Sequence, residues 1–205
     1  MARPKKYDET QVIEQGMNLF WHRGFQATAM SDLIEATGLK PGSLYGAFGN
    51  KRTFYQTTLA HYFQGMLQAI DDVLKKSQPA QKTIVEFYDF FIDFCLQTPQ
   101  GCFMVNALFE TPAEDTQQLE QIRAQFSRVK HRLQMVIEQA QSEKVHFFSQ
   151  DASRVAAAML AHIYGLRGYA KFDPDHLPSL KADLLAMLMP PSENYDKDKE
   201  NESTL

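Results

Sequence analysis

Cysteine is scarce in this sequence: its 205 residues include two, Cys95 and Cys102. Two cysteines in a chain of this length are typical of a reducing compartment and not of a disulfide scaffold. The chain also lacks an uninterrupted apolar segment long enough to span a bilayer. Arg3, Lys5 and Lys6 are followed by acidic residues, where a secretory signal would have an apolar run. We therefore expect a cytoplasmic protein with no membrane partner.

The patterns that mark metal sites and catalytic sites are missing as well. The six histidines have no metal-ligand spacing with each other or with the cysteines. Gly42, Gly46 and Gly49 are not followed by the Gly-Lys-Ser/Thr of a phosphate-binding loop. Ser43 lacks the glycine spacing and the preceding strand of a nucleophile elbow. We therefore expect no metal, no cofactor and no enzymatic activity.

Charge is unevenly distributed along the chain. The net charge is −4, which argues against indiscriminate coating of nucleic acid. Residues 1–55, however, contain seven Lys or Arg and five Asp or Glu, whereas the remainder contains fourteen and twenty. A basic head on an acidic body is typical of a protein that contacts DNA at one end only.

Apolar residues recur at helical steps of three and four through most of the chain, and no segment shows convincing strand alternation. Asp8 has the position of a helix N-cap, as does Asp151. The spacing predicts an all-α protein with helices over residues 8–23, 28–37, 41–48, 51–76, 80–98, 102–110, 119–140, 151–172 and 177–189. The polar residues 191–205 are expected to be disordered.

Residues 28–55 contain the most specific pattern. Thr28 is a candidate cap for a first short helix, and Gly38 stands where that helix would end in a left-handed conformation. Pro41 suits the first position of a second helix, whose Leu44 and Phe48 would face inward together. Two short helices joined by a Gly-containing turn are typical of a helix-turn-helix, in which the second helix enters the DNA major groove.

This stretch resembles the N-terminal domain of the TetR family of bacterial transcription regulators. The matching features are Gly24-Phe25, Thr37-Gly38-Leu39, Gly42-Ser43-Leu44-Tyr45, Phe48 and Lys51. The resemblance implies a helix-turn-helix domain over residues 1–50 with a basic arm at 1–7, and a helical effector-binding and dimerisation domain over 51–190. It also implies a repressor that binds a palindromic double-stranded operator as a homodimer and is released by a small-molecule effector.

Carried over residue by residue, the resemblance assigns DNA contacts to specific positions. Tyr45 and Lys51 would hold phosphates, Thr28 would add a backbone contact, and Gly42 and Ser43 would approach base edges. Lys40 and the arm residues Arg3, Lys5 and Lys6 would assist. The arm is equally compatible with a solubilising terminus.

The resemblance also implies an effector pocket and a dimer interface. Candidate pocket residues are the aromatic and polar side chains Phe63, Phe87, Phe91, Phe94, Phe103, Asn106, Phe126, His162 and Tyr164. An aromatic stripe at helical spacing is, alternatively, ordinary core. The helices at 151–172 and 177–189 would pair two subunits through small residues, namely Ala156, Ala157, Ala158, Ala161 and Gly165. The alternative is interior packing within one subunit.

Cys102 follows Gly101 in a segment similar to one found in family members that sense oxidants or electrophiles. A cysteine at the start of a short helix has a favoured thiolate, and Cys95 is near enough in sequence for a disulfide to be considered. The alternative is a buried, inert thiol.

An all-α, thiol-dependent enzyme with an accidental N-terminal resemblance is the alternative function. Salt-sensitive binding to a palindromic duplex separates the two functions.

Overall fold

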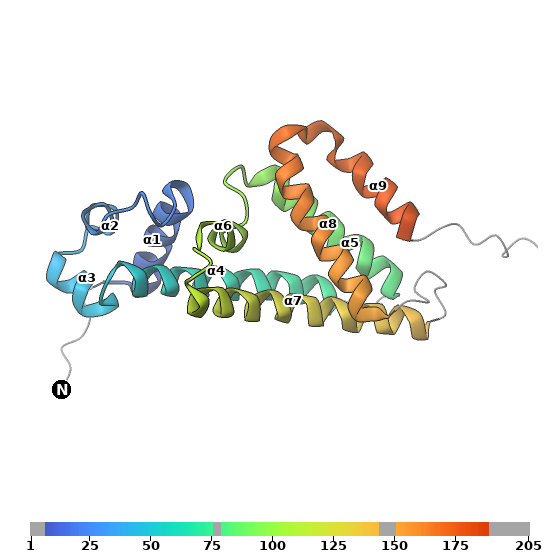
Figure 1. Ribbon diagram of the computed structural model, residues 1–205, viewed down its shortest axis with the longest axis horizontal. Coiled ribbons are helices and arrows are strands. Elements are labelled where there is room, and N and C mark those ends of the chain that lie inside the picture. Colours follow the sequence, from blue (N-terminus) through green and yellow to red (C-terminus); the bar gives the residue numbers. More distant parts are fainter. Residues whose placement is uncertain (1–6, 76–78, 144–150, 189–205) are drawn as a thin grey trace, which may run out of the picture. The chain divides into compact units, whose positions relative to one another are not determined.

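The computed structural model describes residues 7–75, 79–143 and 151–188. These residues form nine α-helices, one short 3-10 helix and no strand (Figure 1), which confirms the all-α prediction. The α-helices are α1 Glu9–Arg23, α2 Met30–Thr37, α3 Pro41–Phe48, α4 Lys51–Leu74, α5 Ala80–Gln97, α6 Phe103–Glu110, α7 Thr116–Ser142, α8 Ala152–Phe172 and α9 Leu177–Leu188. The arm residues 1–6 and the predicted tail 191–205 lie outside the described residues.

The backbone is organised as two compact units. The first contains residues up to Asp71 together with Thr98–Val129, and the second contains Asp72–Gln97 and the residues from Lys130 onward. The division between the two units falls within α4 and α7. The reason is that the first turns of α4, together with α6, supply core side chains to the N-terminal helices.

Aromatic side chains form the core of the first unit. The ring of Phe20 on α1 lies 5.0 Å from that of Tyr55 and 6.2 Å from that of Phe54, both on α4. Phe48 of α3 stacks on Phe54 at 4.3 Å. Phe54 also requires a glycine opposite it, because a Cβ at Gly16 would lie 2.5 Å from its ring. Close aromatic packing therefore fixes α1, α3 and α4 against one another.

The second unit contains α5, α8 and α9. Ile92 and Cys95 of α5 are buried with Leu166 of α8 and Leu177 at the start of α9. The side chain of Asp151 accepts a hydrogen bond from the Arg154 N–H at 2.9 Å, which confirms the predicted N-cap of α8. In Figure 1, α5 and α8 run side by side, in agreement with their backbone contacts.

Among the residues that the structure describes, three buried polar atoms of the second unit have no hydrogen-bond partner: the Tyr88 hydroxyl, Nδ1 of His162 and Nη1 of Arg167. The rings of Tyr88 and His162 lie 6.0 Å apart. Burial raises the pKa of the Tyr88 hydroxyl and lowers the pKa of the His162 imidazole. An unpaired buried polar group costs about 1–3 kcal/mol, so this unit retains polar groups that its own fold does not satisfy.

Within the described ranges, no helix combines the length and apolar character needed to cross a membrane.

Candidate nucleic-acid interface

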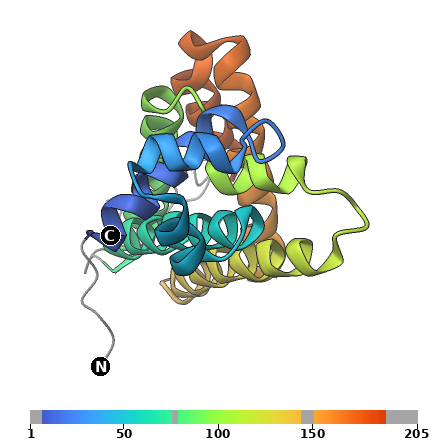
Figure 2. The ribbon, with the colours of Figure 1, turned by 90° about the vertical axis from the view of Figure 1, so that its left-hand side faces the viewer.

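The turn between α2 and α3 has the predicted geometry. Gly38 ends α2 with a φ of 64°, in the left-handed region, and its N–H donates to the Glu35 carbonyl. Pro41 is the first residue of α3. Leu44 and Phe48 of α3 are buried, as predicted. Because these two side chains anchor one side of α3, the opposite side is exposed. Figure 2 shows the three N-terminal helices, coloured in shades of blue.

The exposed side of α3 has few side chains. Tyr45 is 49% exposed, and Gly42, Ser43 and Gly46 are also exposed. A Cβ added at Gly42 or Gly46 would meet no atom of the protein within 4 Å. The backbone of α3 can therefore come close to an external surface, with Tyr45 as its largest outward side chain.

Lys40 precedes this surface as the N-cap residue of α3 and is exposed. At the other end, Gly49 ends α3, and the Asn50 side chain accepts from the Thr53 N–H at 3.0 Å. Asn50 therefore caps the start of α4.

Thr28 has a different role from the predicted one. The N-cap of α2 is Ala29, whose N–H donates to the Asp32 carboxylate at 2.8 Å. Thr28 is 1% exposed, and its hydroxyl donates to the Gly24 carbonyl at 2.8 Å. The predicted cap is therefore wrong, because the Thr28 hydroxyl bonds to the Gly24 carbonyl and Ala29 is the N-cap of α2.

Lys51 binds the loop that precedes α2. Its Nζ donates to the carbonyls of Phe25 and Thr28, each at 2.9 Å, and lies 4.3 Å from the centre of the Phe25 ring. An ammonium has three N–H donors, so these two carbonyls leave one for a phosphate. The structure thus gives Lys51 an intramolecular role that the sequence did not indicate.

Two acidic residues, Glu110 at the end of α6 and Asp115 just before α7, bind the loop before α2 and the start of α4. The Glu110 carboxylate accepts from the Phe25 N–H at 2.9 Å. Asp115 pairs with Arg52 in the first turn of α4 at 2.6 Å, and the Arg52 guanidinium lowers the pKa of the Asp115 carboxyl. Sequence reasoning missed both residues, because partners more than sixty positions apart leave no local pattern.

The comparisons agree with this architecture. Residues 12–58 match the family described as "Bacterial regulatory proteins, tetR family", and residues 80–182 match "Tetracyclin repressor-like, C-terminal domain". The chain belongs to the TetR family.

The chain is also similar to curated relatives and to solved structures. The HTH-type transcriptional repressor ComR of Escherichia coli (strain K12) is 33% identical over 108 residues, which is 51% of this TetR-family chain and 51% of ComR. The chain thus spans about half the length of the curated relatives that it matches. A cysteine mutant of the TetR family regulator CifR, complexed with operator DNA, has a TM-score of 0.77 at 24% identity, covering 92% of this chain and 99% of that one.

A TetR regulator from Chloroflexus aurantiacus has a TM-score of 0.80 at 22% identity and covers 88% of this chain and 93% of its own. At these identities the two structures establish the shared fold of this TetR-family chain.

The nine predicted pocket residues fall in both units of this TetR-family chain. Phe63, Phe103, Asn106 and Phe126 belong to the first unit, and Phe87, Phe91, Phe94, His162 and Tyr164 belong to the second. Phe87 and Phe103 are almost fully buried. The amide of Asn106 donates to the Gln100 carbonyl at 2.8 Å. Among these nine described residues, His162 is the one with a buried side-chain nitrogen that has no hydrogen-bond partner.

Both cysteines are free thiols in this TetR-family chain, and Cys95 is buried. Cys102 is partly exposed and is the N-cap residue of α6, as expected for a cysteine at a helix start. Its Sγ accepts a hydrogen bond from the Tyr62 hydroxyl at 3.4 Å. No group of three or more His, Cys, Asp or Glu in the described part of this chain is placed to hold a metal ion.

Proposed function

We propose that this protein is a cytoplasmic transcriptional repressor that binds a palindromic operator as a homodimer and is released by a small-molecule effector. The exposed α3 carries the proposal: its inner side is anchored by Leu44 and Phe48, and its outer side consists of Gly42, Ser43, Tyr45 and Gly46. In a helix-turn-helix protein this second helix enters the major groove.

The proposed contacts follow from position. Tyr45 and Lys40 contact phosphates, and Gly42 and Ser43 approach base edges. The third N–H of Lys51 donates to a phosphate while its other two hold the loop before α2. Arg3, Lys5 and Lys6 extend the basic surface. Thr28 is left out because its side chain is buried.

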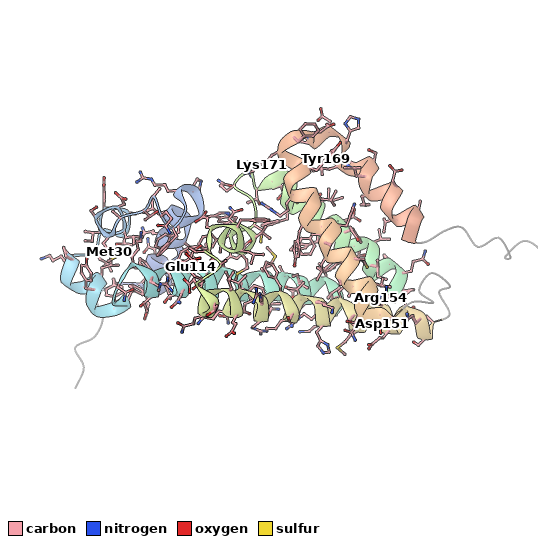
Figure 3. All side chains as sticks on the ribbon, viewed as in Figure 1. Met30, Glu114, Asp151, Arg154, Tyr169 and Lys171 are labelled. Carbon is pink, nitrogen blue, oxygen red and sulfur yellow. The ribbon has the colours of Figure 1, made fainter. Side chains whose placement is uncertain are left out.

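The proposed dimer interface is an exposed face of α8. Small residues recur along it at helical steps: Ala157, Ala158, Ala161, Gly165 and Gly168 are all exposed. Ala156, predicted to belong to this face, is fully buried and packs within the subunit. Arg154 lies near the N-terminal end of α8 and Tyr169 near its C-terminal end (Figure 3). Small side chains let two helices approach closely, and pairing two helix-turn-helix domains permits recognition of two half-sites.

Selection of duplexes from a random library by the purified protein tests DNA binding. We expect a palindromic consensus and an affinity that falls with salt. Lys51→Ala should weaken binding to every sequence and reduce the salt slope by about one. Arg123→Ala removes an exposed cation from α7 in the same unit and serves as the control. Equal affinity and slope in Lys51→Ala and wild type would remove Lys51 from the interface.

Release by an effector is tested with small neutral, acidic and basic compounds. A compound that raises the melting temperature and also weakens operator binding supports the proposal. If no compound in a broad panel does both, the effector part of the proposal fails while DNA binding stands.

The hydrogen bond to Cys102 favours thiol chemistry as a second means of control. Cys102 is partly exposed at the start of α6, and its Sγ is contacted by the Tyr62 hydroxyl, so a change at the sulfur would alter this contact. We infer that alkylation or mild oxidation of Cys102 weakens DNA binding. Cys102→Ser should abolish that response, whereas Cys95→Ser, at a buried thiol, should retain it. Equal release in wild type and Cys102→Ser would show that Cys102 only packs.

A further inference from the structure

A cavity of about 320 Å³ lies between α4 and α7 in the first unit. Its lining residues are Gln56, Leu59, Ala60, Met104, Gln118, Gln121, Ile122 and Gln125. None of the nine pocket residues expected from the sequence is among them. Small-molecule sites in proteins have volumes of roughly 300–1,000 Å³, so this cavity is large enough for a compact ligand.

The floor of the cavity is apolar and rigidly placed. Leu59 of α4, Met104 of α6 and Ile122 of α7 contribute to it, and each is at most 4% exposed. Because each belongs to a different helix and each is held in the core, the floor is formed before any ligand arrives. A ligand with an apolar body would remove this surface from water.

Primary amides supply the polar part of the lining. Gln56 comes from α4, and Gln118, Gln121 and Gln125 come from successive turns of α7. The side-chain amide of Gln56 donates to the side-chain oxygen Oε1 of Gln118 at 3.0 Å, and Gln118 is 5% exposed. Each amide offers two N–H donors and one carbonyl acceptor. None of the eight lining residues carries a charge.

We propose that this cavity is the effector site, and that it selects uncharged ligands with an apolar body and at least one hydrogen-bonding group. The proposal rests on the function proposed above and adds the site and the ligand class. An uncharged ligand satisfies its polar groups with the amides. A charged ligand would lose its hydration on entering the cavity and would find no opposite charge in the lining, so its binding is strongly disfavoured.

The site is connected to the DNA-reading helices within the same unit. The Gln118 N–H donates to the Asp115 carboxylate at 3.3 Å, and Asp115 pairs with Arg52 in the first turn of α4. Gln118 also lines a smaller cavity together with Phe25, Arg52 and Tyr55. A ligand that forms a hydrogen bond with the Gln118 side-chain amide therefore binds within one turn of Asp115, whose ion pair with Arg52 holds the start of α4. The helix α4 directly follows α3.

Two fluorescent probes with the same carbon skeleton test the ligand class. N-phenylnaphthylamine is neutral and has one N–H donor, whereas anilinonaphthalenesulfonate adds a negative charge. We expect the neutral probe to bind the full-length protein at least about tenfold more tightly than the sulfonate. Equal affinities, or no binding of the neutral probe, would overturn the proposal.

Ala60→Trp tests the location of the site. Ala60 is exposed and lines the cavity, so a tryptophan there fills the opening without replacing a core side chain. It should weaken binding of the neutral probe by at least about tenfold. Ala124→Trp, at an exposed position of α7 outside the lining, is the matched control and should bind like wild type. Unchanged binding in Ala60→Trp would place the probe elsewhere and overturn the assignment.

Gln121→Lys provides a second test that does not depend on filling the cavity. Gln121 is exposed, and a lysine there supplies the charge that the lining lacks. It should raise the affinity for the sulfonate severalfold relative to the affinity for the neutral probe. If the ratio of the two affinities is the same as in wild type, Gln121 does not face the bound probe and the assignment of the site is overturned. All titrations are made without DNA. A failure of the cavity is thereby distinguished from a failure of operator binding, which the duplex selection measures separately.

Discussion

The two units of this chain satisfy their polar groups in different ways. In the first unit, elements far apart in sequence are joined by specific hydrogen bonds: Trp21 donates to the Gly101 carbonyl at 2.7 Å, Glu110 accepts from Phe25, and Arg52 pairs with Asp115. In the described part of the second unit, three buried polar atoms have no hydrogen-bond partner, and one face of α8 exposes small residues.

This difference in hydrogen bonding agrees with the different roles proposed for the two units. On the proposed function, the first unit presents α3 to DNA, and specific contacts between its elements hold that helix in a fixed orientation. On the proposed function, the second unit pairs with a second copy, and its surface stays uncovered until that copy binds. The second unit also has polar contacts between its elements. The Glu143 carboxylate accepts a hydrogen bond from the Ala80 N–H at 2.9 Å, and Lys181 pairs with Asp89. The cluster of buried side chains that joins α5, α8 and α9 is apolar.

The largest expected effect comes from breaking the proposed pairing of the second unit. Ala161→Arg places a charge on the exposed small-residue face of α8, next to the same charge of the partner copy, which costs several kcal/mol in association. We expect a monomer by light scattering and a loss of operator affinity of about a hundredfold or more. Ala124→Arg, on an exposed face of α7, should remain dimeric. A dimeric Ala161→Arg protein would exclude this face from the interface.

Gly16→Ala tests the close packing of the first unit. The added Cβ would lie 2.5 Å from the Phe54 ring, and overpacking of this kind typically costs about 1–3 kcal/mol. The same change at Gly65, where a Cβ meets nothing within 4 Å, should stabilise α4 by about 0.5–1 kcal/mol. Urea unfolding measures both changes. If Gly16→Ala is neutral, the aromatic core is looser than its geometry indicates.

Gly46→Ala should act with opposite sign on stability and on DNA binding. No protein atom lies near the added methyl group, so the free energy of unfolding should rise by about 0.5–1 kcal/mol. On the proposed DNA-facing side of α3 the methyl group holds the backbone away from the groove, so operator affinity should fall severalfold. Gly65→Ala is the control: it should raise the free energy of unfolding and leave operator affinity unchanged. Unchanged operator affinity in Gly46→Ala would mean that this end of α3 does not approach DNA closely.

The smallest expected effects are those of two histidines in the second unit, which should respond to pH in opposite directions. Burial lowers the pKa of His162 below 6.5, so its contribution to stability is present above pH 6.5 and is lost as pH falls through the lowered pKa. The Asp173 carboxylate, 2.8 Å from Nδ1, raises the pKa of His176. Its contribution is therefore complete below pH 6.5 and is lost as pH rises through the raised pKa.

Melting temperatures from about pH 5 to about pH 8 measure both effects. His162→Gln should remove the loss of stability on the acid side. His176→Gln should lower stability at acid pH and match wild type at alkaline pH. Parallel curves for a variant and wild type would contradict the assignment for that histidine.

The sequence by itself determined the local structure, because the residues that decide it lie within a few positions of one another. Gly38 ends α2, Pro41 begins α3, and Asp151 caps α8, each through conformational preferences of its own backbone or side chain. Leu44 and Phe48 are buried because their spacing puts them on one side of a helix. The same local rules predicted the bounds of the helices to within a few residues.

The tertiary structure alone decided which residues meet across the chain. It buried Thr28 against Gly24, gave Lys51 two backbone carbonyls, and buried Ala156 while leaving the neighbouring Ala157 exposed. It also brought Glu110 to Phe25 and formed a glutamine-lined cavity from side chains of α4 and α7. Such pairings depend on how whole helices pack. Packing is set by the summed shape of many side chains, which no short stretch of sequence contains.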